Sequence, residues 1–92
     1  VNYAITKGIL VTNSPKPVIE PTAELAFSLL LNVARRVSEC DRKLRSSRGI
    51  EIDVMENLGI SLYGKTLGIV GMGAIGQALA RRASACGMRI IY

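Results

Sequence analysis

Hydrophobic positions along the chain fall into groups that polar or glycine-rich stretches separate. Residues 2–7 read as the tail of a helix, and Gly8 is placed to end it in the left-handed conformation that follows many helices. The stretch "GILVTN", residues 8–13, predicts a short buried strand. Pro15 and Pro17 in the following "NSPKP" predict an extended crossing segment.

A long helix is the next expected element, from about Pro21 to Arg45. Proline loses no hydrogen bond in the first helical turn, and Glu20 and Glu24 complement the positive helix start. Polar side chains recur at helical spacing and form one narrow stripe: Glu24, Ser28, Asn32, Arg35, Glu39 and Arg42. Most of the remaining circumference is apolar, so other protein segments are expected to cover this helix on most sides. They would belong either to its own domain or to a second subunit.

A polar stretch, residues 46–65, is expected to be a surface loop with one helical turn. The run "TLGIVG", residues 66–71, lacks polar alternation and is typical of a central parallel strand buried on both faces. A helix follows, whose apolar residues should share one face: Ile75, Leu79, Ala83 and Cys86. Gly87 is expected to end this helix, and "MRIIY" to begin a second strand.

The turn between this strand and helix has the spacing G-x-G-x-x-G at Gly71, Gly73 and Gly76. The first glycine permits a tight turn, the second lets a pyrophosphate approach the backbone, and the third lets helix and strand pack closely. Free amide groups at the helix start would face the phosphates. Because a strand precedes the motif and a helix follows it, the pattern favours dinucleotide binding over a purely structural turn.

Charge and cysteine content limit the functional classes to which this protein could belong. The 92 residues carry a net charge of +5, and half of the twelve basic residues lie between Arg35 and Arg48. Glu39 and Asp41 interrupt this run and no aromatic residue follows within it, so a solvated helix end is favoured over a nucleic-acid surface. Two lone cysteines and no histidine indicate no metal site and suit a reducing, cytoplasmic setting.

Membrane insertion is not expected. The longest apolar stretch, "AELAFSLLLNVA", is too short to span a bilayer and contains Glu24.

Two segments together resemble the D-isomer-specific 2-hydroxyacid dehydrogenases: "VTNSPKPVIEPTAELAFSLLLNVARR" and "LYGKTLGIVGMGAIGQALARRA". The resemblance implies an α/β fold, namely a partial Rossmann-type NAD-binding domain with a doubly wound parallel sheet, truncated at both ends. Residues 1–14 would end the first lobe of the substrate domain, and residues 15–20 would be the interdomain crossing. Residues 21–92 would then be the N-terminal part of the dinucleotide-binding domain.

The same resemblance implies a cofactor site made of six residues: Ile19, Gly71, Gly73, Ala74, Ile75 and Gly76. Ile19 would lie near the nicotinamide, at a position where the family often has a threonine. NAD is the expected cofactor, and NADP stays open. The acidic residue that would hold the adenosine ribose is expected about 20 residues beyond the first glycine, where this sequence ends.

The implied reaction is reversible hydride transfer between D-2-hydroxyacids, which become 2-oxoacids, and NAD(P). The family uses a histidine, an acidic residue and a substrate-binding arginine. This sequence has no histidine, so we expect no catalytic residue in it and no activity from the 92 residues alone. The resemblance also favours a homodimer through the helix over residues 21–45.

Two alternatives differ in class. One is an NAD-sensing corepressor-like binding module of the same fold. The other is a different enzyme with a related nucleotide domain, against which the segment "NSPKPVIEPTAEL" argues because it matches the hydroxyacid family specifically.

Overall fold

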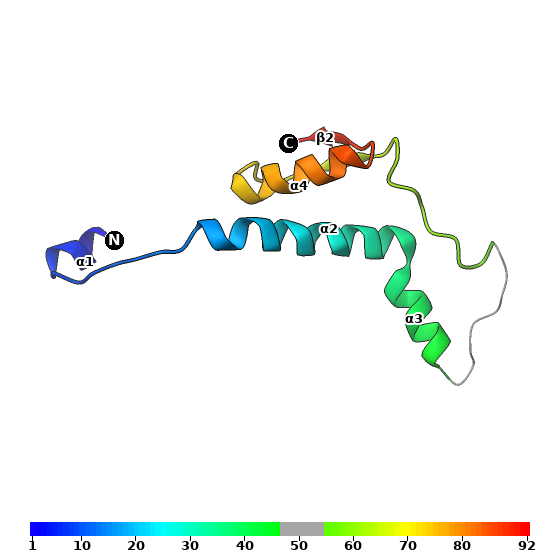
Figure 1. The fold of residues 1–92 in the computed structure, drawn as a ribbon, viewed down its shortest axis with the longest axis horizontal. Helices are drawn as coiled ribbons and strands as arrows, with labels where there is room; N and C mark the ends of the chain where they lie inside the picture. The colour runs from blue at the N-terminus through cyan, green and yellow to red at the C-terminus, as the bar shows by residue number, and fades with distance from the viewer. Residues whose placement is uncertain (47–54) are drawn as a thin grey trace.

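Helices dominate the chain in a computed structural model that describes residues 1–46 and 55–92 (Figure 1). The elements follow in the order α1 (Asn2–Thr6), the 3-10 helix η1 (Lys16–Val18), α2 (Ile19–Arg35), α3 (Val37–Arg45), β1 (Thr66–Gly68), α4 (Ala74–Ala85) and β2 (Arg89–Ile91). Residues 47–54 of the predicted polar loop lie outside the described residues, and residues 55–57 form a turn.

The first helix stands apart from the rest. As predicted, α1 is followed by Gly8 in the left-handed conformation, with a φ of +67°. An extended segment joins α1 to the body, so the prediction of a strand over residues 8–13 is wrong (Figure 1). A strand needs a neighbouring strand for its N–H and C=O groups, and among the described residues no strand pairs with this segment. The prolines that predicted an extended crossing instead lie at the start of η1.

The expected single helix over residues 21–45 is also wrong, because the structure divides it into α2 and α3. The first of these begins two residues earlier, at Ile19. Pro21 costs nothing there, since the first N–H groups of a helix have no partner inside the helix. At Arg36 the backbone turns left-handed, with a φ of 57°, and α3 projects away from the body (Figure 1).

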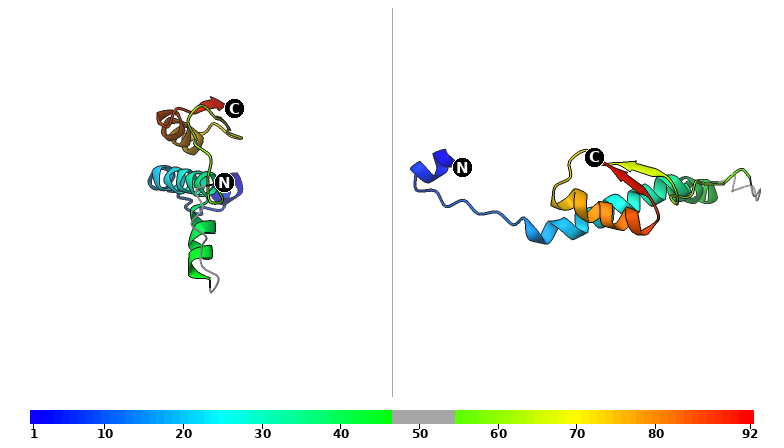
Figure 2. Two further views of the ribbon diagram at one scale, coloured as in Figure 1. Left: turned by 90° about the vertical axis from the view of Figure 1, so that its right-hand side faces the viewer. Right: turned by 90° about the horizontal axis from the view of Figure 1, so that it is seen from above.

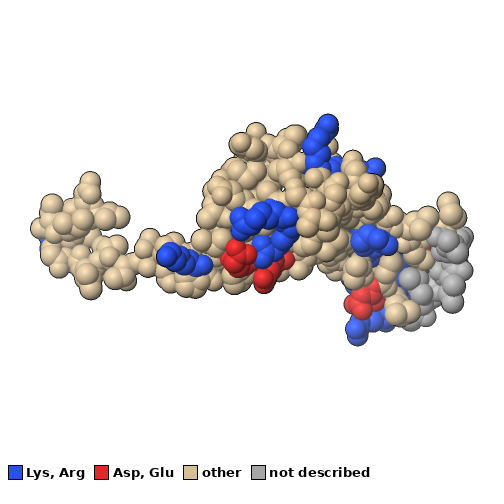
Figure 3. All heavy atoms as spheres, turned by 45° about the horizontal axis from the view of Figure 1, so that its top comes forward, with Lys and Arg blue, Asp and Glu red and all other residues tan. Residues whose placement is uncertain are grey.

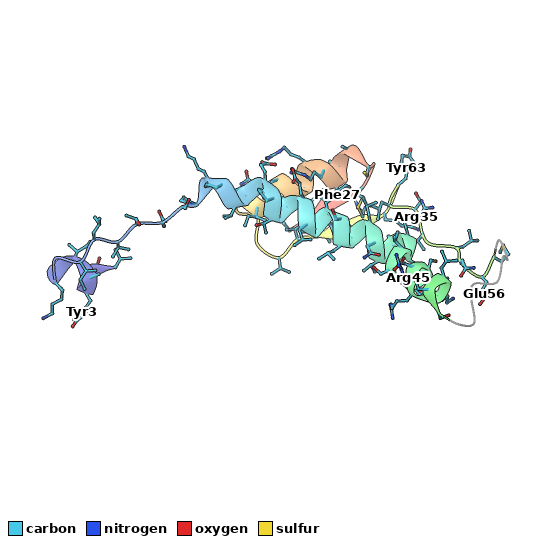
Figure 4. All side chains as sticks on the ribbon, turned by 60° about the horizontal axis from the view of Figure 1, so that its bottom comes forward. Tyr3, Phe27, Arg35, Arg45, Glu56 and Tyr63 are labelled. Atoms are coloured by element: carbon cyan, nitrogen blue, oxygen red, sulfur yellow. The ribbon has the colours of Figure 1, made fainter. Side chains whose placement is uncertain are left out.

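Arg36 is held at this break by contacts to α3 and to the loop that follows it. Its guanidinium donates to both carboxylate oxygens of Glu39, and this hydrogen bonding lowers the pKa of Glu39 to about 2. The same group donates to the main-chain carbonyl of Glu56 over 2.7 Å, in the loop that returns beside α3 (Figure 4). Asn32 completes the junction by accepting a hydrogen bond from the main-chain N–H of Ser38 over 2.7 Å.

The returning loop also closes the end of α2. Ile60 donates its main-chain N–H to the carbonyl of Ala34 over 2.8 Å. Gly59 passes so close that an added Cβ would lie 2.5 Å from the same carbonyl oxygen. The break is therefore stabilised by residues more than twenty positions away in the sequence.

The two strands form a parallel pair, with Leu67 opposite Ile90 in the register. The connecting helix α4 contacts both α2 and β2, as Figure 2 shows from two sides. Gly87 follows α4 with a φ of +74°, so both the end of this helix and the second strand were predicted correctly. A parallel pair joined through a helix is the basic unit of α/β folds.

A small core lies where these elements meet. Its buried members are Ala34, Leu62, Ala83 and Met88. Half-buried apolar side chains of α2 and of both strands pack against it, among them Phe27, which Figure 4 labels. On α4, Leu79, Ala83 and Cys86 are at least partly buried as predicted, but Ile75 is exposed.

Burial of the first strand on both faces does not occur within the described residues. Leu67 packs towards the core, whereas Val70, just beyond β1, is fully exposed and Ile91 is 55% exposed. Side chains alternate along a strand, so Leu67 and Val70 point to opposite faces. Among the described residues no helix covers the face of Val70, which is the open face.

The molecule is elongated, with extents of 65 × 34 × 18 Å and a radius of gyration of 19.7 Å. A compact domain of this length would have a radius of about 12 Å. Consequently α2 presents apolar side chains to solvent along one face, Leu25, Leu29 and Val33. Phe27 and Leu31, although apolar, are turned towards the core instead.

Candidate functional site

The turn between β1 and α4 takes its shape from its glycines. Gly71 has a φ of +99°, a conformation that favours glycine. Gly76 is buried in the first turn of α4, where an added Cβ would lie 2.3 Å from the main-chain oxygen of Gly71. Both residues therefore have a structural reason inside the chain to be glycine.

Gly73 is different, because no described residue requires a glycine at this position. It is the N-cap of α4, in an extended conformation with a φ of −74°, and an added Cβ would meet no described atom within 4 Å. The space beside it is open, and no side chain caps the helix start. Unpaired N–H groups and the helix dipole make such a position suitable for an anion such as a phosphate.

A cleft of about 390 Å³ opens onto this turn. One wall is the turn and the start of α4, lined by Gly71, Gly73, Ala74, Ile75 and Gly76. The other wall comes from the segment at the start of α2, with Pro15, Val18 and Ile19. All six residues that the sequence predicts for the cofactor site thus line one cleft, although Ile19 is more than fifty positions from the turn.

The second wall is apolar, because half-buried Ile19 and exposed Val18 have only hydrocarbon side chains. Such a wall can pack against a ring but cannot donate or accept a hydrogen bond through these side chains. Pro15 and Val18 were missed in the sequence. Their only signal is that they stand close to Ile19.

Gln77 is a further residue that sequence reasoning missed. Its side-chain amide donates to the carbonyl of Met72 over 3.1 Å, which holds the middle of the glycine turn from the outside. Because a trans peptide points its C=O and N–H in opposite directions, this contact orients the N–H of Gly73 away from Gln77.

A second cleft, of about 280 Å³, lies beyond the carboxyl ends of the strands and on the open face. It is lined by Gly68 at the end of β1 with the following Ile69 and Val70, and by Ile91 at the end of β2 with the following Tyr92. Ligands of open α/β sheets bind at the carboxyl ends of the strands. The glycine turn therefore stands between two concave surfaces.

Residues 1–46 and 55–92 contain no group of three or more His, Cys, Asp or Glu side chains that could hold a metal ion. Among the helices of this part of the chain, none is both long and apolar enough to cross a membrane.

Comparison with protein families matches residues 27–92 to the NAD-binding domain of the D-isomer-specific 2-hydroxyacid dehydrogenases. A glyoxylate reductase of Korarchaeum cryptofilum is 52% identical over 93 residues, which is 100% of this chain and 28% of that protein. A glyoxylate reductase of Thermococcus litoralis is 51% identical over 96 residues, with 29% of that protein covered. The chain thus spans less than a third of the length of these relatives.

Solved structures agree with the family match. A protein of Thermus thermophilus superposes with a TM-score of 0.91 at 47% identity, over 99% of this chain and 29% of the other. An NADPH-dependent glyoxylate/hydroxypyruvate reductase of Sinorhizobium meliloti, in complex with NADP and malonate, gives a TM-score of 0.80 at 38% identity. That match covers 99% of this chain and 28% of the reductase.

Proposed function

Because the chain belongs to the D-isomer-specific 2-hydroxyacid dehydrogenase family, we propose that it is the cofactor-binding segment of a longer oxidoreductase that reduces 2-oxoacids reversibly. Its β1–α4–β2 unit is Rossmann-type, and NAD is the cofactor of the matched domain, with NADP not excluded. Relatives named glyoxylate reductase favour a small 2-oxoacid as the substrate.

The observation that carries this proposal is the cleft that joins the open space at Gly73 to the apolar wall at Ile19. The pyrophosphate would lie against Gly73, Ala74 and Ile75, where backbone amides of the turn and helix start face it. The adenosine half runs towards the end of the second strand in such folds. The nicotinamide half would then lie along Val18 and Ile19.

When bound, the nicotinamide supplies or accepts the hydride. The residues of this chain would bind and orient the cofactor: the turn fixes the phosphates, and the apolar wall packs against the ring and excludes water from it. The sequence contains no histidine, so a histidine acid/base must come from elsewhere in the protein.

The domain boundaries remain a proposal. Residues 1–14, with α1 and the extended segment, would belong to a substrate lobe, since they lie apart from the body (Figure 1). Residues 15–20 would be the interdomain crossing, and residues 21–92 the start of the nucleotide domain. We propose a cytoplasmic location, in keeping with two free cysteines, Cys40 and Cys86.

The activity test compares the full-length protein with the 92 residues alone. We expect the full-length protein to oxidise NADH in the presence of glyoxylate or hydroxypyruvate, followed by the loss of NADH absorbance. The 92 residues alone should give only the buffer rate, because they lack the acid/base group. A full-length protein that binds NADH but reduces no 2-oxoacid would refute the proposed reaction.

We also propose a homodimer through α2. Its outer face exposes Leu25 by 61%, Leu29 by 53% and Val33 by 78%, in a row at helical spacing. Burial of each leucine would contribute about 1.5–3 kcal/mol before entropic costs. A second copy packed against this face would cover the side chains that the single chain leaves in solvent.

Replacing Leu25 and Leu29 together by Glu is expected to turn a dimer into a monomer, as measured by light scattering of the full-length protein. Ser28→Glu is the matched control, because Ser28 lies on the polar stripe of the same helix and is exposed. It should leave the dimer intact. A monomeric unmodified protein would exclude this interface.

A further inference from the structure

A cluster of charged side chains joins α2 to α4 beside the cofactor cleft. Arg82 donates to Glu20 over 2.6 Å and more weakly to Glu24 over 3.4 Å. Arg81 reaches the other carboxylate oxygen of Glu20 over 3.3 Å. Figure 3 shows basic and acidic side chains side by side on this face of the body.

Arg82 is the best anchored member of the cluster. Its side chain is only 24% exposed, and its other terminal nitrogen donates to the main-chain carbonyl of Ala78 over 2.9 Å, one turn back along α4. The guanidinium is therefore fixed to its own helix before it reaches across. Because its fork presents several donors in fixed directions, it can define the position of the carboxylate that it grips.

The position of Glu20 affects the cleft, because Glu20 is next to a residue of the cleft wall. It directly follows Ile19, which lines the apolar wall, whereas Arg82 belongs to the helix whose start forms the opposite wall. Ala23 on α2 and Ala78 on α4 are both fully buried, and small side chains at such positions let two helices approach closely. The larger apolar contacts, such as Phe27 against the core that includes Ala83, lie further along α2. The ion pairs therefore tie the first turn of α2, next to the cleft, to α4.

We propose that Glu20, gripped by Arg82 and Arg81, is a positioning residue that holds the apolar wall at Val18 and Ile19 in register with the glycine turn. This role rests on the proposed function, because the wall matters only if a dinucleotide spans the cleft. We call these ion pairs, from Arg82 and Arg81 to Glu20, the latch. The latch would act on the nicotinamide half of the cofactor and leave the contacts of the adenosine and pyrophosphate unchanged.

The ionisation of the cluster fits a permanent latch. The hydrogen bond from Arg82 lowers the pKa of the Glu20 carboxyl, and the nearby charges of Arg82 and Arg81 act in the same direction. Glu20 is therefore charged throughout the neutral range, and the latch does not open with pH there. High salt should weaken it, since Glu20 is 54% exposed.

The test uses Glu20→Gln in the full-length protein, with Glu24→Gln as the matched control on the next turn of the same helix. Two ligands are compared by calorimetry: NADH, and ADP-ribose, which keeps the adenosine and both phosphates but lacks the nicotinamide. We expect Glu20→Gln to raise the Kd of NADH about tenfold and to change the Kd of ADP-ribose less than twofold. Glu24→Gln should change neither by more than twofold.

A double-mutant cycle identifies the partner. If the two side chains act as one unit, Glu20→Gln combined with Arg82→Gln should weaken NADH binding no more than either change alone. Glu20→Asp keeps the charge and should recover part of the lost affinity, and it serves as the second variant if Glu20→Gln does not fold.

The outcomes separate a positioning role of Glu20, a purely structural role of the cluster and a failure of the proposed function. If the unmodified protein binds NADH and Glu20→Gln weakens both ligands equally, the cluster only stabilises the fold and the latch is wrong. If NADH binding is unchanged in both Glu20→Gln and Glu20→Asp, the latch is also wrong. If the unmodified protein binds neither ligand, the proposed function itself fails.

Discussion

Gly73→Val is expected to weaken NADH binding to the full-length protein at least a hundredfold while leaving its fold intact. In the structure an added Cβ at Gly73 meets no described atom within 4 Å, so the side chain has room in the absence of ligand. With a φ of −74° the backbone is also acceptable for valine. The side chain would occupy the space beside the helix start, where the pyrophosphate is proposed to lie.

A hundredfold change corresponds to about 2.7 kcal/mol of binding free energy, which calorimetry resolves easily. The fold should lose about 1 kcal/mol or less, because glycine is a better N-cap than an apolar residue. Ser84→Val is the control, since Ser84 is exposed near the other end of α4 and lines neither cleft. Unchanged NADH affinity in Gly73→Val would remove Gly73 from the cofactor site.

Gly76→Val is expected to destabilise the fold, whereas Gly73→Val is expected to weaken NADH binding and keep the fold. An added Cβ would lie 2.3 Å from the main-chain oxygen of Gly71 and 3.3 Å from its carbonyl carbon. Backbone atoms cannot rotate aside as a flexible side chain can, so α4 must move away from the turn. We expect a loss of more than about 2 kcal/mol in the free energy of unfolding.

Urea unfolding followed by circular dichroism measures this loss, and Gly73→Ala in the same protein is the matched control. NADH affinity should also fall in Gly76→Val, but only together with stability. A variant with full stability would show that α4 and the turn can separate without cost, and the close packing seen here would not be required.

The contrast between these two glycines marks a limit of the sequence motif. The spacing G-x-G-x-x-G assigns a role to each position, and the structural role predicted for Gly76 agrees with the packing. Only the tertiary structure separates Gly76, which the fold needs, from Gly73, which the fold does not. The ligand role of Gly73 stays a prediction that the first experiment tests.

Local patterns were sufficient for the C-terminal part of the chain, residues 66–92. The strand at Thr66–Gly68, the helix at Ala74–Ala85 and the second strand at Arg89–Ile91 all lie within the segments that the sequence predicts, although the strand expected over residues 66–71 ends at Gly68. These elements are specified by short-range features, namely an apolar run, glycines at a turn and a glycine after a helix. The order of strand, helix and strand then leads to a parallel pair.

The two wrong elements depend on partners that are distant in the sequence, present in one case and absent in the other. The expected helix over residues 21–45 breaks at Arg36, where Glu56 and the return past Gly59 stabilise a left-handed residue in addition to its neighbour Glu39. Helix propensity is too small to resist such contacts. The segment over residues 8–13 has the composition of a strand, but a strand exists only when a neighbour accepts and donates its hydrogen bonds.

The sequence by itself determined the family, the glycine turn and the elements around it, because each depends on residues close together in the chain. Only the tertiary structure decided that Ile19 faces Gly73 across a cleft, that Glu20 meets Arg82, and which apolar side chains of α2 remain exposed. These facts depend on how α2 packs against α4. That packing is the sum of many weak contacts between residues about sixty positions apart, which no local pattern encodes.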